Sequence, residues 1–206
     1  KIYASRLGLV EYGEKVVQVV ALNTFYIPSV GDQVIGKIED VNINGWVVNI
    51  NSPYKATLRA SEALNKPYRQ QKDDLTRFLD VGDLIFAKII AFDRTIDPVL
   101  TIKESGLGKI TQGQIVKVSP AKIPRIIGRK ASMINMLKRE TECKITVGQN
   151  GIILISGPSP EHERLAIMAI EKIAQEAHTS GLTDRITEMI RKEKGARNER
   201  KDQVNK

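Results

Sequence analysis

The first hundred residues alternate between short apolar runs and polar turns, a pattern typical of β-strands rather than helices. The runs rich in β-branched and aromatic residues cover 7–10, 16–22, 34–38, 45–50, 55–59, 84–91 and 99–103. The first two flank a turn and predict an N-terminal hairpin. A two-stranded hairpin is marginal alone in water, so this one needs either the body of the protein or a partner to cover it.

Two of the five later runs are preceded by the same short sequence, which is an internal repeat. Val30-Gly31-Asp32 and Val81-Gly82-Asp83 each place a Gly-Asp turn directly before an apolar strand. Five short strands separated by turns within residues 28–104 predict a small barrel. The polar stretch 65–80 is expected to be a longer excursion that contains a helical turn.

The period changes after the glycine-rich stretch 105–113, which we expect to be a hinge. Strands are predicted at 114–118, 143–147 and 152–155, and helical segments at 122–127, 132–141 and 161–177. The resulting order is β-α-α-β-β-α. A further helix is expected at 184–194, and the polar segment 196–206 is expected to be mobile because it has almost nothing apolar to bury.

These elements give a multidomain α+β chain. We expect an N-terminal β domain at 1–27, a five-stranded barrel at 28–104, a hinge at 105–113, a β-α-α-β-β-α domain at 114–180 and a partly mobile helical tail at 181–206.

The net charge of +8 is concentrated in one part of the chain. The stretch from Ser105 to Arg139 has eight basic residues and no acidic one, so the rest of the chain is formally neutral. The eight are Lys109, Lys117, Lys122, Arg125, Arg129, Lys130, Lys138 and Arg139. Such a field attracts a polyanion, most commonly nucleic acid, although a solvated basic face gives the same pattern.

Catalytic and metal-binding patterns are missing from the sequence. It has no nucleophile elbow, no phosphate-binding loop and no His-Glu-x-x-His. Cys143 is the single cysteine, and His162 and His178 are interpreted as surface residues. We therefore expect no catalytic residue, no cofactor and no metal. No apolar run approaches the roughly 20 residues of a membrane helix, and a cytoplasmic location is expected.

The most informative stretch joins the first two helical segments of the C-terminal domain, Ile126-Ile127-Gly128-Arg129-Lys130-Ala131-Ser132. It resembles the Gly-x-x-Gly loop of KH domains, whose backbone clamps about four nucleotides. Arg129 and Lys130 fill the two variable positions. Ala131 replaces the second glycine, which leaves two interpretations open: a working RNA clamp, or a scaffold that kept its fold and charge. Lys122, Arg125 and Gly128 complete the expected contacts of this domain.

The barrel segment resembles the S1 class of OB folds. The resemblance depends on Gly36-Lys37-Ile38, Gly45-Trp46-Val47, Arg59-Ala60-Ser61-Glu62 and Ala91-Phe92-Asp93. It implies RNA contacts from Lys37, Trp46 and Arg59, with Trp46 as a stacking surface. The alternatives are that Trp46 belongs to the barrel core and that the two basic residues are solvated strand positions.

The arrangement of all three parts resembles the RNA-binding cap subunits of the archaeal exosome. That family implies a non-catalytic role on a hexameric ring of phosphorolytic 3′-5′ exoribonucleases. Three cap subunits surround the entry pore, bind single-stranded RNA and guide 3′ ends inward. In this interpretation the N-terminal strands dock on the ring, and the alternative is that they pack on the chain's own domains. The alternative family is a NusA-type transcription factor, which would need a second KH module. Polynucleotide phosphorylase would need a catalytic core for which this chain has no space.

Overall fold

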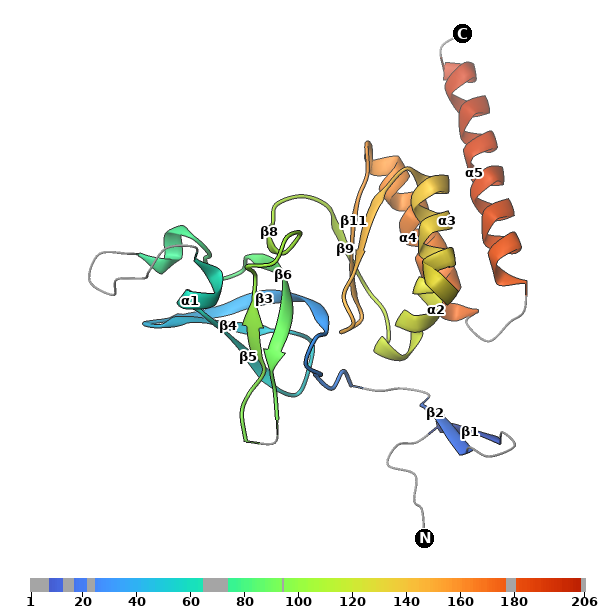
Figure 1. The fold of residues 1–206 in the computed structure, drawn as a ribbon. Coiled ribbons are helices and arrows are strands. Elements are labelled where there is room, and N and C mark those ends of the chain that lie inside the picture. The colour runs from blue at the N-terminus through green and yellow to red at the C-terminus, as the bar shows by residue number, and fades with distance from the viewer. Residues whose placement is uncertain are drawn as a thin grey trace. The chain divides into compact units, whose positions relative to one another are not determined.

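A computed structural model describes residues 8–12, 17–21, 25–64, 74–93, 95–176 and 181–204 (Figure 1). The chain forms two compact units. The first comprises Lys1–Thr111, Ser119–Ala121 and Gly148–Ile152, and the second comprises Gln112–Val118, Lys122–Val147 and Ile153–Lys206. Each unit has its own apolar core, which is what separate domains require. The bounds of the five segments expected from the sequence remain predictions.

The N-terminal hairpin is present in the first unit. Strands β1 (Gly8–Tyr12) and β2 (Val17–Ala21) pair antiparallel. Within this hairpin, the side chains of Val10 and Val17 are exposed. The hairpin therefore shows apolar surface that could meet a partner.

Five strands form the barrel that the pattern predicted. They are β3 (Gln33–Asn42), β4 (Gly45–Asn49), β5 (Lys55–Arg59), β6 (Leu84–Ala91) and β7 (Val99–Thr101). Their order is β3-β4-β5-β7-β6, and a further pairing between β3 and β6 closes the sheet. All of these pairs are antiparallel except β5 with β7. The S1-type OB fold is thus confirmed.

The internal repeat of Val-Gly-Asp is explained by the pairing of β3 with β6. Gly31 N–H donates to the Ile89 carbonyl, and Gly82 N–H donates to the Ile38 carbonyl. Gly31 and Gly82 are equivalent positions of the repeat, and so are Ile38 and Ile89. The two hydrogen bonds are therefore equivalent. Both glycines have a positive φ, 95° and 97°, which residues with a side chain rarely adopt. The repeated Gly-Asp turn therefore starts two strands that pair with each other.

The expected hinge contains a strand that the sequence did not predict. Strand β8 (Gly108–Ile110) pairs antiparallel with β6 and extends the sheet to six strands. Lys109 Nζ forms an ion pair with Asp83 at the start of β6. Helix α1 (Ala60–Ala63) precedes the polar stretch 65–80. Within that stretch the 3-10 turn η1 (Leu75–Arg77) is the helical turn that was predicted. Residues 65–73 lie outside the described part.

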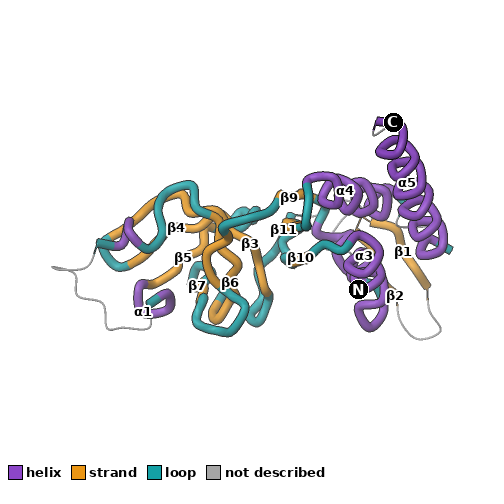
Figure 2. Tube along the Cα trace, turned by 90° about the horizontal axis from the view of Figure 1, so that it is seen from above, coloured by secondary structure: helices purple, strands orange, loops and turns teal. Residues whose placement is uncertain are grey.

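The KH order β-α-α-β-β-α is confirmed in the C-terminal domain. Its elements are β9 (Gln114–Lys117), the 3-10 turn η2 (Pro120–Lys122), α2 (Ile123–Ile127), the 3-10 turn η3 (Arg129–Ala131), α3 (Ser132–Thr141), β10 (Lys144–Val147), β11 (Ile152–Ser156) and α4 (Pro160–Gln175). The sheet order is β10-β11-β9, and the helices lie on one face of this sheet (Figure 2). This packing places the η3 turn at the start of α3.

Helix α5 (Leu182–Val204) packs against α3 and α4. Leu182, Ile186 and Ile190 recur every four residues and are fully buried, so they form one apolar stripe. The helix was expected to end at 194, but its backbone continues to Val204. The expected mobility of 196–206 stays a prediction.

Candidate nucleic-acid interface

Trp46 lies in the core of the barrel. None of its side chain is exposed, and its Nε1 donates to the Leu79 carbonyl over 2.8 Å. Successive side chains of a strand point to opposite faces of the sheet. In β4, Trp46 and Val48 point inward and Val47 points outward. A fully buried ring has no face to offer a base. The structure therefore supports the core interpretation of Trp46 and not the stacking role that the S1 resemblance implied.

A pocket of about 750 Å³ opens at the β3–β4 turn beside the end of β5. It is lined by Asn42, Ile43, Asn44, Gly45, Trp46, Thr57, Arg59, Ala60 and Ser61. Its size is that of a site for a small ligand or part of a larger one. The mixture of an exposed apolar residue, Ile43, with amide and hydroxyl groups suits a nucleotide unit. Arg59 supplies the positive charge.

Lys37 does not line this pocket, because it lies five residues before Asn42 on β3. Lys37 is exposed on β3, opposite Asn49 of β4. The sequence analysis missed Ile43, which is 75% exposed at the tip of the turn. The sequence did indicate its exposure, because an isoleucine between two asparagines in a tight turn cannot be buried in the core.

Several barrel lysines are neutralised by neighbouring carboxylates. Lys88 lies 2.7 Å from Glu104, and Lys55 lies 3.5 Å from Glu39. The hydrogen bond from Lys109 lowers the pKa of the Asp83 carboxyl, so Asp83 is ionised at neutral pH. In contrast, within the described ranges no carboxylate forms an ion pair with Arg59. Arg59 is therefore the better placed of these cations for a phosphate.

The loop between α2 and α3 has positive φ values at Gly128, Lys130 and Ala131. Gly128 has φ 74°, and a Cβ there would lie 2.8 Å from the Met133 backbone nitrogen. Lys130 and Ala131 follow with φ values of 50° and 60°. The methyl group of Ala131 thus does not prevent the left-handed conformation that a second glycine would adopt. Both interpretations require this loop conformation, and RNA contact by the loop stays a prediction.

Four basic residues of the second unit lie in this loop or on the short helix before it. Arg129 and Lys130 are exposed, and no ion pair joins either one to a carboxylate in the part of the chain that is described. Lys122 precedes α2 and Arg125 is exposed on it. All five expected residues of this domain, Gly128 among them, lie on α2 and its two flanks. The barrel residues form a separate set in the first unit.

Searches for other kinds of site give no candidate within the described ranges. No group of three His, Cys, Asp or Glu side chains there is arranged to hold a metal ion. Among the same residues, no helix is both long and apolar enough to cross a membrane. His162, which was expected at the surface, is partly exposed and bonds Ser159 Oγ through Nδ1 at 2.8 Å. Cys143 is buried, and burial raises the pKa of its thiol.

Comparisons with known proteins agree with this architecture. The S1 domain model of RRP4 matches residues 25–91, and the KH domain model matches residues 113–172. The exosome complex component Rrp4 of Thermofilum pendens is 48% identical over 92% of this chain and 81% of its own length. The Rrp4 of Aeropyrum pernix is 49% identical over 86% of this chain and 76% of its own length.

A solved structure supports the same assignment. A crystal structure assigned as an exosome complex RNA-binding protein is 49% identical, with a TM-score of 0.80, and the match covers 84% of this chain and 99% of that one. These matches favour the exosome interpretation over the NusA-type alternative. By sequence identity, domain content and fold, the chain belongs to the family of the exosome complex component Rrp4.

Proposed function

We propose that this chain is the RNA-binding cap subunit of an exosome, and that it recruits single-stranded RNA through both of its domains. The observation that carries the proposal is the KH loop. It holds a clamp-like backbone at Gly128 and Ala131 and presents Arg129 and Lys130 without an ion-pair partner among the described residues. The pocket beside Arg59 adds a second candidate contact in the barrel.

RNA binding by the full chain tests this proposal. We expect weak binding that tolerates many sequences, because the cations suit phosphates and no set of base-reading side chains is evident. Phosphate contacts release counterions, so the logarithm of affinity should fall with the logarithm of salt by about 0.7 per contact. Fluorescence anisotropy with a labelled oligonucleotide from low to high salt measures this slope. Affinity that does not change with salt would contradict the proposal.

In this proposal the chain itself is not catalytic. Nucleotide release on incubation of the pure chain with RNA and inorganic phosphate would contradict it. The same incubation with a phosphorolytic ring added is expected to release nucleoside diphosphates.

The proposed partner is the hexameric ring, with about three copies of this chain guiding 3′ ends into its pore. The N-terminal hairpin is the proposed docking element, because Val10 and Val17 are 47% and 64% exposed. Stable protein interfaces bury roughly 800 Å² per partner. Deletion of residues 1–22 should leave a folded chain that binds RNA and no longer co-purifies with the ring. If this variant still assembles, the docking surface lies elsewhere.

A further inference from the structure

The outer face of β5 forms an exposed strip that begins at the pocket and runs to the start of the strand. Lys55, Thr57 and Arg59 point outward, while Ala56 and Leu58 are buried. At about 3.3 Å per residue the strip is roughly 16 Å long. Thr57 and Arg59 line the pocket, so the strip leads away from it toward the start of the strand.

An aromatic pair lies at the far end of this strip. Tyr54 directly precedes β5, and its ring centroid is 5.1 Å from that of Phe92, with the planes inclined at 67°. Phe92 directly follows β6 and is half-buried. The Tyr54 residue is 44% exposed. An edge-to-face contact of this kind holds the tyrosine ring while leaving part of its surface open.

The aromatic pair offers what Trp46 lacks. Stacking needs a ring that is exposed and held in place, and Trp46 is fully buried. Phe78 is also exposed, but it follows η1 and is not part of β5 or its flanks. On the strip itself, Tyr54 is the described residue with an accessible ring.

The charges near the aromatic pair give a phosphate no free cation among the described residues. Lys55 is paired with Glu39 at 3.5 Å. The carboxylate of Asp93 accepts hydrogen bonds from Thr95 N, Thr95 Oγ1 and Ile96 N, so its own turn occupies it. A nucleic acid would gain little from charge at this end. It would gain from contact with the ring.

We propose that Tyr54, supported by Phe92, stacks on a base of an RNA strand whose phosphate contacts Arg59 at the other end of β5. This inference rests on the proposed function and adds a stacking position in the barrel. A track of this length holds a few nucleotides, near the low end of the roughly 4–16 nucleotides bound by one OB fold.

Two probes and three variants of the full chain test the inference. The probes are a labelled ten-nucleotide oligouridine and an oligomer of the same length that lacks bases. Tyr54→Ala should weaken oligouridine binding by about 5- to 10-fold, the low end of the range for base–aromatic stacking. Tyr54→Phe keeps the ring and should bind like the unaltered chain. Phe78→Ala removes an exposed ring outside the strip and should also have no effect.

The probe without bases separates stacking from other roles. Its affinity should be the same for Tyr54→Ala and for the unaltered chain. Equal loss with both probes, or no loss with oligouridine, overturns the stacking role. If the unaltered chain binds neither probe at low salt, the proposed function itself fails. Circular dichroism of each variant establishes that its fold is intact.

Discussion

At the scale of single residues, Ala131 has an unusual backbone for a residue with a side chain. Its φ is 60°, a conformation that costs an L-residue about 1–2 kcal/mol. Glycine would remove that cost but lose more entropy on folding. We expect Ala131→Gly to raise the free energy of unfolding by about 0.5–1 kcal/mol. Urea denaturation followed by circular dichroism measures the change.

The matched control is the same substitution in an ordinary helix. Ala174 lies in the last turn of α4, where Ala→Gly is expected to destabilise by up to about 1 kcal/mol. Opposite signs at the two positions would establish that the loop is strained. Destabilisation of similar size at both would show that Ala131 is relaxed.

Trp46 allows a second prediction at this scale. Trp46→Phe removes the hydrogen bond to the Leu79 carbonyl and leaves that buried acceptor without its donor. We expect a loss of about 1–3 kcal/mol in the free energy of unfolding. RNA affinity under conditions where the variant is folded should not change, since the ring is not exposed. A selective loss of affinity with normal stability would restore the stacking role.

These residues show where sequence reasoning reaches its limit at a site. The motif around Gly128 placed the loop correctly because its glycine and its flanking helices are local features. The neighbouring residues in the sequence could not predict whether the Trp46 side chain points into the barrel or out of it. Whether a strand residue points inward depends on the register of β4 with β3 and β5, which is fixed by pairing along the sheet.

At the scale of elements, the strands and helices that were predicted well are those with a strong internal pattern. Strand β5 and helix α3 begin and end where their polar and apolar residues indicated. Strand β8 was missed because its three residues, Gly-Lys-Ile, carry no period. It exists through pairing with β6, a partner more than twenty residues away. The extent of α5 was underestimated because its apolar stripe stops at Ile190.

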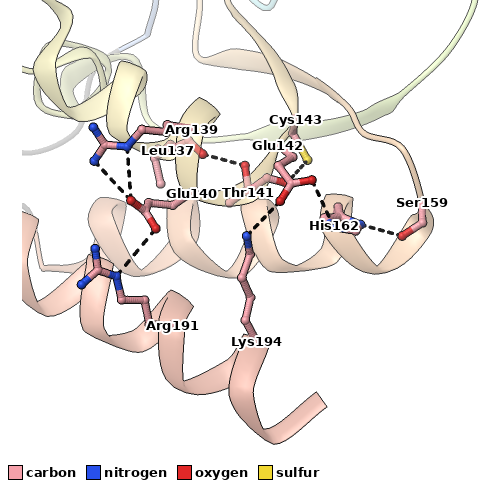
Figure 3. A network of polar contacts seen from close by, with 10 residues as sticks. All are labelled: Leu137, Arg139, Glu140, Thr141, Glu142, Cys143, Ser159, His162, Arg191 and Lys194. Carbon is pink, nitrogen blue, oxygen red and sulfur yellow. Dashed lines mark hydrogen bonds and ion pairs between the residues drawn. The ribbon is translucent and has the colours of Figure 1, made fainter. Parts of the chain in front are cut away.

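Helix α5 is held by both apolar burial and ion pairs, and their contributions to stability can be compared. Arg191 Nε lies 3.8 Å from Glu140 and Lys194 Nζ lies 3.3 Å from Glu142, so both pairs join α5 to the end of α3 (Figure 3). The Arg191 side chain is 70% exposed, although that of Glu140 is only 15% exposed, and pairs that water reaches contribute about 0–1 kcal/mol. Ile186 is fully buried, and Ile→Ala substitutions in a core cost about 2–5 kcal/mol.

We therefore expect Ile186→Ala to lower the free energy of unfolding by about 2–4 kcal/mol and Arg191→Ala by less than about 1 kcal/mol. The helical signal at 222 nm during urea denaturation reports on both variants, because most helical residues belong to the second unit. A larger loss for Arg191→Ala would show that the network in Figure 3, and not the apolar stripe, fastens α5.

At the scale of the whole molecule, the net charge is +8, and we expect only a few of the basic residues to contact RNA phosphates. Each phosphate contact contributes about 0.7 to the salt slope of single-strand binding, so Arg129→Ala with Lys130→Ala should reduce the slope by about 1.4. The loss of affinity should be uniform across sequences, as expected for phosphate contacts. Arg191→Ala with Lys192→Ala removes the same charge from α5. It should leave the slope nearly unchanged.

The two domains are expected to contribute unequally. Arg59 lines a pocket, where a contact with phosphate is partly shielded from water and therefore stronger, whereas Arg129 and Lys130 lie on an open turn. We expect Lys37→Ala with Arg59→Ala to weaken RNA binding more than the Arg129 and Lys130 pair does, with a similar change in salt slope. Anisotropy titrations of both double variants, alone and assembled with the ring, give the comparison. A larger loss for the loop variant would mean that the KH clamp, and not the barrel, is the main contact surface.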